Sequence, residues 1–166
     1  LETAELAIQA ALTGHLVIST LHTNDSISSV IRLMDLGVLP NLINASLHGV
    51  IAQRLVRKLC PHCRKKEEVS DELWGTFVHI YETPRPDFVY NPDGCEECHH
   101  TGYIGRRPVY ELMQVDKEIK EAITNKLDFA ELEKVVRGKY ITMREHGIQL
   151  VLSGDTSIEE VLKSVH

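Results

Sequence analysis

The sequence predicts an α/β fold that carries a cysteine-bearing insertion and ends in a helical part. Three observations lead to this prediction. A helix, a short apolar segment and another helix follow one another near the N-terminus, two Cys-x-x-Cys pairs stand in the middle of the chain, and helix-capping residues recur after residue 115. Alternation of helices with apolar strands is typical of α/β sheets.

The N-terminal segment predicts helix, strand and helix in that order. Residues 4–12 carry apolar side chains at helical spacing. Residues 15–21, HLVISTL, are short, apolar and rich in β-branched side chains, so a strand covered on both faces is expected there. Asn24 or Asp25 then caps a helix whose apolar face runs over 27–34.

The middle of the chain predicts shorter elements. A helix is expected over 41–52. Residues 54–60 alternate apolar and basic side chains, which is the period of a half-exposed strand. Another short helix is expected over 71–81, and the three prolines and the glycine of 82–94 indicate a loop.

The remaining elements follow the second cysteine pair. Residues 101–115 predict two extended segments with glycine-rich turns. The tail is expected to be helical, because Asp116 and Asp128 stand where N-cap residues belong, and Thr156 with Glu159 has the spacing of a capping box.

The composition is that of an ordinary globular protein and excludes several classes. The chain has 166 residues, of which 43% are hydrophobic and 25% charged, and its formal net charge is -6. An acidic balance argues against broad nucleic-acid binding, which needs a basic face. No apolar run has the length of a membrane span, so no direct membrane insertion is expected. The opening residues LETAELAIQAAL continue a helix without a cap or a starting methionine, which suggests a piece of a longer protein.

The four cysteines form two pairs, Cys60 with Cys63 and Cys95 with Cys98, separated by 31 residues. Two facing Cys-x-x-Cys turns supply a closed tetrahedral shell of four thiolates, which predicts a structural zinc ion. Two disulfides or four free thiols are the alternatives, and iron is a second candidate metal. The neighbouring histidines are rival ligands that four thiolates make unnecessary: His62, His99 and His100.

Several stretches together resemble the C-terminal part of the secretion ATPase superfamily. They are LETAELAIQAALTGHLVISTLHTND, RLMDLGV, AQRLVRKLCPHC, CEECHHTGYIGRRPVYELM and SGDTSIEEVL. The resemblance is nearest to the type II secretion ATPases and the type IV pilus extension ATPases, since the retraction motors of this superfamily lack the four cysteines. It implies the C-terminal part of a RecA-like ATPase core over 1–59, a tetracysteine zinc subdomain over 60–102, and a C-terminal hairpin and helical subdomain over 103–166.

The resemblance also implies roles for individual residues. LET places Glu2 as a catalytic residue and Thr3 as a nucleotide-binding one, STLHTN places His22 near the γ-phosphate, and AQRLVR makes Arg54 a nucleotide contact. Cys60, Cys63, Cys95 and Cys98 match the zinc motif of the family. For His22 the residues give the same placement, because ligands of open α/β sheets sit at the carboxyl ends of strands and His22 follows the predicted strand. The alternative is a histidine that merely bonds to backbone at a strand end.

The resemblance implies a cytoplasmic ring ATPase as the intact parent, a homo-hexamer that uses ATP and Mg2+ and works with inner-membrane secretion or pilus platform proteins. This chain contains no GxxxxGK[ST] phosphate loop. It is therefore expected neither to bind ATP usefully nor to hydrolyse it alone. Whether the parent secretes proteins or assembles a pilus stays open.

Two other functions compete with the motor. A zinc-ribbon module that binds nucleic acid is supported by the cysteines and by the basic stretches RLVRK and RKK, but the acidic total and an aromatic content of 5% argue against it. A stand-alone, zinc-stabilised interaction scaffold is the other alternative.

Overall fold

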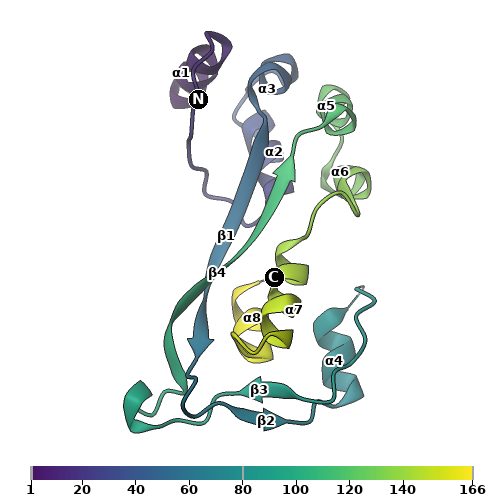
Figure 1. Cartoon of the computed structure of the whole chain (residues 1–166). Coiled ribbons are helices and arrows are strands. Elements are labelled where there is room, and N and C mark those ends of the chain that lie inside the picture. The colour runs from purple at the N-terminus through teal and green to yellow at the C-terminus, as the bar shows by residue number, and fades with distance from the viewer. Residues whose placement is uncertain (1, 80, 166) are drawn as a thin grey trace. The chain divides into compact units, whose positions relative to one another are not determined.

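The structure, a computed structural model, describes residues 2–79 and 81–165 (Figure 1). Its residues form two compact units. The first consists of Leu1–Ala52 and Glu111–Ile141, and the second of Gln53–Tyr110 and Thr142–His166. The three-part division expected from the sequence, 1–59, 60–102 and 103–166, uses other boundaries and stays a prediction.

The first unit is a cluster of helices around an apolar core. Its helices are α1 (Glu2–Leu12), α2 (Ser26–Asp35), α3 (Pro40–Ser46), α5 (Lys117–Thr124) and α6 (Phe129–Val136). Helix α3 packs against α1 and α5, and α6 packs against α2 and α5. As predicted, Asp116 and Asp128 cap α5 and α6 with their side chains, and of the two candidates for α2, Asn24 and Asp25, it is Asp25 that caps the helix. The fully buried side chains of this core are Val30, Ile43, Met113, Ile119, Ile123 and Leu132.

The second unit combines a small hairpin with helices. Its elements are β2 (Lys65–Glu67), α4 (Asp71–Val78), β3 (Val89–Asn91), the 3-10 helix η1 (Glu96–Cys98), α7 (Met143–Leu152) and α8 (Ile158–Ser164). Strands β2 and β3 are antiparallel, with Lys66 opposite Tyr90. Helix α7 packs against α4, α8 and β3. Ile80, within the helix expected over 71–81, lies outside the described residues.

Two longer strands pair with each other, β1 (Gly49–Leu59) and β4 (Tyr103–Gln114). They run in opposite directions (Figure 1). Each strand contributes residues to both units. The half-exposed strand predicted over 54–60 is confirmed, because β1 covers 54–59 and has Val56 and Leu59 buried. The apolar and basic side chains do not separate cleanly, since Leu55 is exposed and Arg54 half-buried.

The strand expected over 15–21 is wrong, because these residues have no regular secondary structure. Leu16 and Ile18 are 88% and 87% exposed. A strand needs a neighbouring backbone for its hydrogen bonds, and the described strands pair only as β1 with β4 and β2 with β3. The apolar pattern therefore has neither the pairing nor the cover that it predicts.

Three other expectations change in detail. The helix expected over 41–52 ends at Ser46, and β1 already begins at Gly49. Within 101–115 a single long strand forms, β4 (Tyr103–Gln114), rather than two segments. Ser157, not Thr156, caps α8, because the Thr156 hydroxyl is turned away and donates to the Arg57 carbonyl at 2.8 Å.

An ion pair ties α8 to β1. The Glu160 carboxylate, 5% exposed, accepts from the Arg57 backbone N–H at 2.9 Å and from Arg57 Nε at 2.6 Å. The Arg57 guanidinium also stacks on Tyr103, whose hydroxyl lies 2.9 Å from Ser157 Oγ. Burial alone would raise the pKa of Glu160, but the hydrogen bonds from Arg57 outweigh it and hold that pKa below its usual value. This pair fixes the start of α8 through charge-assisted bonds.

None of the helices in the described residues combines the length and the apolar character that crossing a bilayer requires.

Two helical glycines of the second unit give a matched test of its packing. A Cβ on Gly147 of α7 would lie 2.6 Å from Cγ1 of the fully buried Val161 of α8, whereas a Cβ on Gly75 of α4 would meet nothing within 4 Å. We expect Gly147→Ala to lower the free energy of unfolding by about 1–3 kcal/mol through overpacking. Gly75→Ala should raise it by about 0.5–1 kcal/mol through helix propensity. Urea unfolding of both variants checks this, and equal effects would contradict the packing of α7 on α8.

Candidate functional site

The four cysteines come together in the second unit. Cys60 follows the last residue of β1, Cys95 directly precedes η1, and Cys98 is the last residue of η1. Their four Sγ atoms all lie within 4.8 Å of one another. Three of the six Sγ–Sγ distances are 3.8 Å for Cys60 to Cys95, 3.8 Å for Cys63 to Cys98 and 3.7 Å for Cys95 to Cys98.

These distances fit a shared metal ion. Four sulfurs about 2.3 Å from one zinc stand about 3.8 Å apart at the edges of the tetrahedron. A disulfide needs sulfurs about 2.0 Å apart, and all four cysteines are free. Among the described residues, the grouped ligands are the four cysteines, without the nearby histidines. The sulfur set is closed, so the chemistry it suits is a structural cross-link.

Backbone amides donate hydrogen bonds to two of the sulfurs. The Cys95 and Gly102 N–H groups donate to Cys98 Sγ, each at 3.2 Å, and the Gly94 N–H donates to Cys63 Sγ at 3.3 Å. Both glycines have positive φ, +127° for Gly94 and +75° for Gly102, and a Cβ on either would meet backbone or Pro92. A side chain at either position would collide with its surroundings, so these two glycines belong to the site although the sequence reasoning did not single them out. Their positions in DGC and TGY, beside the cysteine pair, are the signal that could have found them.

The surroundings shift the pKa values of the thiols in different directions. Burial opposes ionisation of Cys98, but the N–H donors of Cys95 and Gly102 outweigh it and lower the pKa of this thiol to about 6. At Cys63 burial prevails over the single Gly94 donor and raises the pKa to about 12. The donors thus favour the thiolate of Cys98, whereas burial disfavours the thiolate of Cys63. Metal binding favours thiolates, because a cysteine ligand must give up its proton.

The residues predicted to contact a nucleotide are not part of the cysteine cluster. Glu2 and Thr3 begin α1, and His22 lies in the irregular stretch before α2, and all three side chains are exposed. Arg54 lies on β1 in the second unit and is half-buried. Because 15–21 is not a strand, the strand-end argument for His22 no longer holds, and its role depends on the resemblance alone. The roles of all four residues stay predictions.

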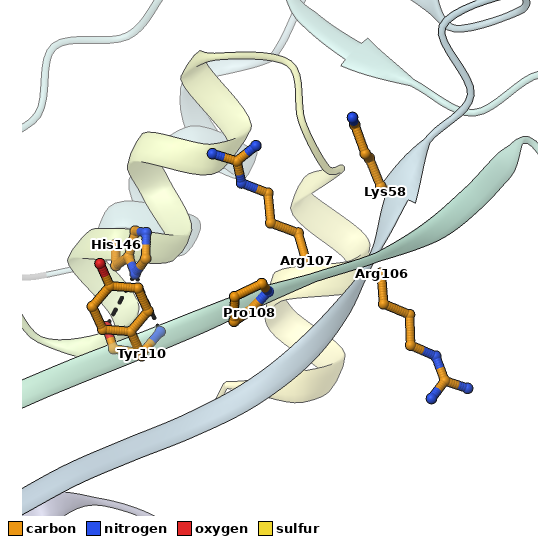
Figure 2. A pocket seen from close by; sticks show the side chains of 6 residues that line it. All are labelled: Lys58, Arg106, Arg107, Pro108, Tyr110 and His146. Atoms are coloured by element: carbon orange, nitrogen blue, oxygen red, sulfur yellow. Dashed lines mark hydrogen bonds between the residues drawn. The ribbon is translucent and has the colours of Figure 1, made fainter.

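An open cavity of about 370 Å³ lies beside the β1 and β4 strands of the second unit. Its lining residues are Lys58, Arg106, Arg107, Pro108, Tyr110 and His146 (Figure 2). Figure 2 shows the Arg106 side chain directed to the opposite side from Arg107 and Lys58. Arg107 is already paired with Asp155 at 3.1 Å. The cations do not converge, so we assign this cavity no ligand.

Comparisons with known proteins give a consistent result. The family described as type II/IV secretion system protein matches residues 1–163. The type IV pilus assembly ATPase TfpB of Acinetobacter baylyi is 47% identical over 99% of this chain and 28% of its own length. The type II secretion system ATPase E of Vibrio cholerae is 44% identical over 98% of this chain and 32% of its own length. The chain thus spans about a third of the length of these relatives.

A solved structure supports the fold. The pilus retraction motor PilT with bound ADP matches with a TM-score of 0.62 and 24% identity, over 98% of this chain and 36% of its own. This likeness confirms the α/β fold expected from the sequence.

The sulfur cluster predicts a response to metal removal. A zinc chelator should lower the thermal midpoint of the chain by roughly 10 °C, which at about 3 °C per kcal/mol corresponds to about 3 kcal/mol. Cys98→Ser should give the low midpoint with or without chelator, because serine is a poor ligand for soft metals. His62→Ala, which changes a residue beside the cluster but outside it, should behave like the wild type. A midpoint that chelator leaves unchanged would contradict a metal role.

Proposed function

Because the chain belongs to the type II/IV secretion system protein family, we propose that it is part of a motor ATPase that powers type II protein secretion or type IV pilus assembly. The observation that supports this most is the identity of 43–47% over nearly the whole chain to ATPases and proteins of these two systems. Pilus and secretion relatives match with similar identities, so the proposal covers both. The relatives do not favour the nucleic-acid or scaffold alternatives.

His22 is the residue through which this chain acts on the nucleotide. Phosphoryl transfer asks a protein mainly to position groups and to stabilise charge. A neutral imidazole can donate to a γ-phosphate oxygen or orient the attacking water. The exposed His22 side chain is free to reach a ligand, and Glu2, Thr3 and Arg54 are the further residues that we assign to the nucleotide site. ATP and Mg2+ are the substrate and cofactor of the intact parent.

Cys60, Cys63, Cys95 and Cys98 hold a structural Zn2+. The support is the closed set of four sulfurs within 4.8 Å, together with the backbone N–H groups that donate to them. When bound, the ion supplies a cross-link and no reactive position. Iron prefers similar ligands, and metal analysis distinguishes the two.

The parent is a cytoplasmic ring, a homo-hexamer, associated with inner-membrane platform proteins of the secretion or pilus machinery. Its hydrolysis cycle drives movements that the platform uses. Within it, residues 1–59 belong to a RecA-like ATPase core, 60–102 to the zinc subdomain and 103–166 to a C-terminal hairpin and helical subdomain.

ATP hydrolysis by the full-length protein that contains this chain tests the proposal. We expect His22→Ala to lower kcat by about a hundredfold or more, the size of effect that one positioned proton-transfer or water-orienting group has. His15→Ala is the matched control, since both histidines are exposed and lie in the same irregular stretch. It should change kcat by less than about threefold, as surface substitutions do. A full-length protein without ATPase activity, or equal losses in both variants, would contradict the assignment.

The isolated 166-residue chain should bind ATP too weakly to measure, because its sequence has no phosphate loop to surround the β- and γ-phosphates. Titration calorimetry with ATP and Mg2+ checks this, with the full-length protein as positive control. A micromolar dissociation constant for the isolated chain would show that the residues present here are sufficient for binding.

A further inference from the structure

A buried carboxylate lies at the N-terminus of α2. Glu111, on β4, is only 5% exposed, and Ser26, the first residue of α2, is fully buried. One oxygen, Oε1, accepts both from the Ser26 backbone N–H at 2.7 Å and from the Ser26 hydroxyl at 2.6 Å. Ser26 and Glu111 are 85 residues apart in the sequence and belong to the same compact unit.

The contact is strong enough to fix the helix end. A carboxylate is costly to bury unless hydrogen bonds compensate it, and bonds to a charged acceptor are stronger than neutral ones. The positive end of the helix dipole adds to the attraction. The Tyr140 hydroxyl lies 3.2 Å from Ser26 Oγ, so a third segment of the same unit reaches this serine.

Further hydrogen bonds continue from Ser26 toward His22. Asp25 caps α2 by accepting from the Ser28 N–H at 2.7 Å and from the Ser28 hydroxyl at 2.8 Å. The hydroxyls of Thr23 and Ser29 lie 2.6 Å apart, and Ser29 Oγ donates to the Asp25 carbonyl at 3.0 Å. The turn over 23–26 is therefore held from several sides, while the preceding residue, His22, is exposed.

We propose that Glu111 is a positioning residue for His22. It holds the N-terminus of α2, the turn over 23–26 carries that constraint backward, and the His22 side chain is thereby presented in a fixed place. The inference rests on the proposed function, in which His22 acts on the third phosphate. Glu111, which lies outside the motifs of the nucleotide site, would thus align His22, which lies inside one of them.

The test compares steady-state ATP hydrolysis by the full-length protein with single and double substitutions. Glu111→Ala removes the acceptor and should lower kcat by about ten- to a hundredfold, the cost of a misplacement of about 1 Å, while KM for ATP changes little. Glu111→Gln keeps an oxygen acceptor of the same shape and should retain most of the activity.

The double variant separates positioning from general damage. If Glu111 acts through His22, then Glu111→Ala combined with His22→Ala should be no slower than His22→Ala alone, because residues that act as a unit are not additive. Glu160→Ala is the matched control: this glutamate is equally buried, at 5% exposure, and accepts hydrogen bonds in the other unit. Its effect should multiply with that of His22→Ala.

The outcomes that contradict the inference can be told apart from those that contradict the proposed function. Independent, multiplying effects of Glu111→Ala and His22→Ala would reduce Glu111 to a structural residue and leave the motor assignment intact. Unchanged kcat in Glu111→Ala would do the same. If Glu111→Ala fails to fold, Glu111→Gln decides alone. A loss of kcat in Glu111→Gln at an unchanged thermal midpoint would contradict the proposal, because an oxygen acceptor of the same shape would then not suffice to position His22. Full activity in His22→Ala would remove the role that Glu111 is said to support, and absence of ATPase activity in the wild type would remove the proposed function as well.

Discussion

Four sulfur atoms from two cysteine pairs, 31 residues apart, meet within 4.8 Å, and the second unit depends on that meeting. Cys60 directly follows β1, and β4 begins shortly after Cys98, so the cluster joins the ends of two strands that pair with each other. The Cys60 N–H also donates to the Gly102 carbonyl at 2.9 Å. Between the pairs lie β2, α4 and β3. A metal ion bound by these sulfurs would cross-link the two ends of the insertion, and the stabilisation from such a cross-link grows with the length of the loop that it closes.

Polar contacts connect other parts of the second unit to the segments next to the cysteines. Arg57 joins β1 to α8 through Glu160, and Arg64, just after the first cysteine pair, donates to the Gly154 carbonyl at 2.5 Å and stacks on Tyr90. Arg57 and Arg64 lie before and after the first cysteine pair in the sequence, and they contact α8 and the loop that precedes it. The first unit is organised differently, around an apolar core, and its notable polar contact is the buried Glu111 at the start of α2. In each unit a buried carboxylate fixes the start of a helix that the hydrophobic pattern alone would leave free to shift.

Sequence reasoning predicted what depends on neighbours in the chain. The caps Asp116 and Asp128, the cap of α2 to within one residue, and the paired cysteines were predictable, because capping and Cys-x-x-Cys turns are local. It failed at 15–21, where an apolar segment becomes a strand only if another strand lies beside it. It missed Thr156 turning to the Arg57 carbonyl, and Ser26 meeting Glu111, because both contacts join residues far apart in the sequence. The amides of Gly94 and Gly102 were missed for a different reason: a glycine pattern indicates a turn but not what its N–H will face.

Metal content of the purified chain tests the central claim most directly. Elemental analysis under reducing conditions should find about one zinc ion per chain, bound by four thiolates in a closed tetrahedral shell. A chain that carries no metal, and that nevertheless shows the same far-ultraviolet circular dichroism and cooperative unfolding, would contradict the account, since its sulfurs would then meet without an ion to hold them.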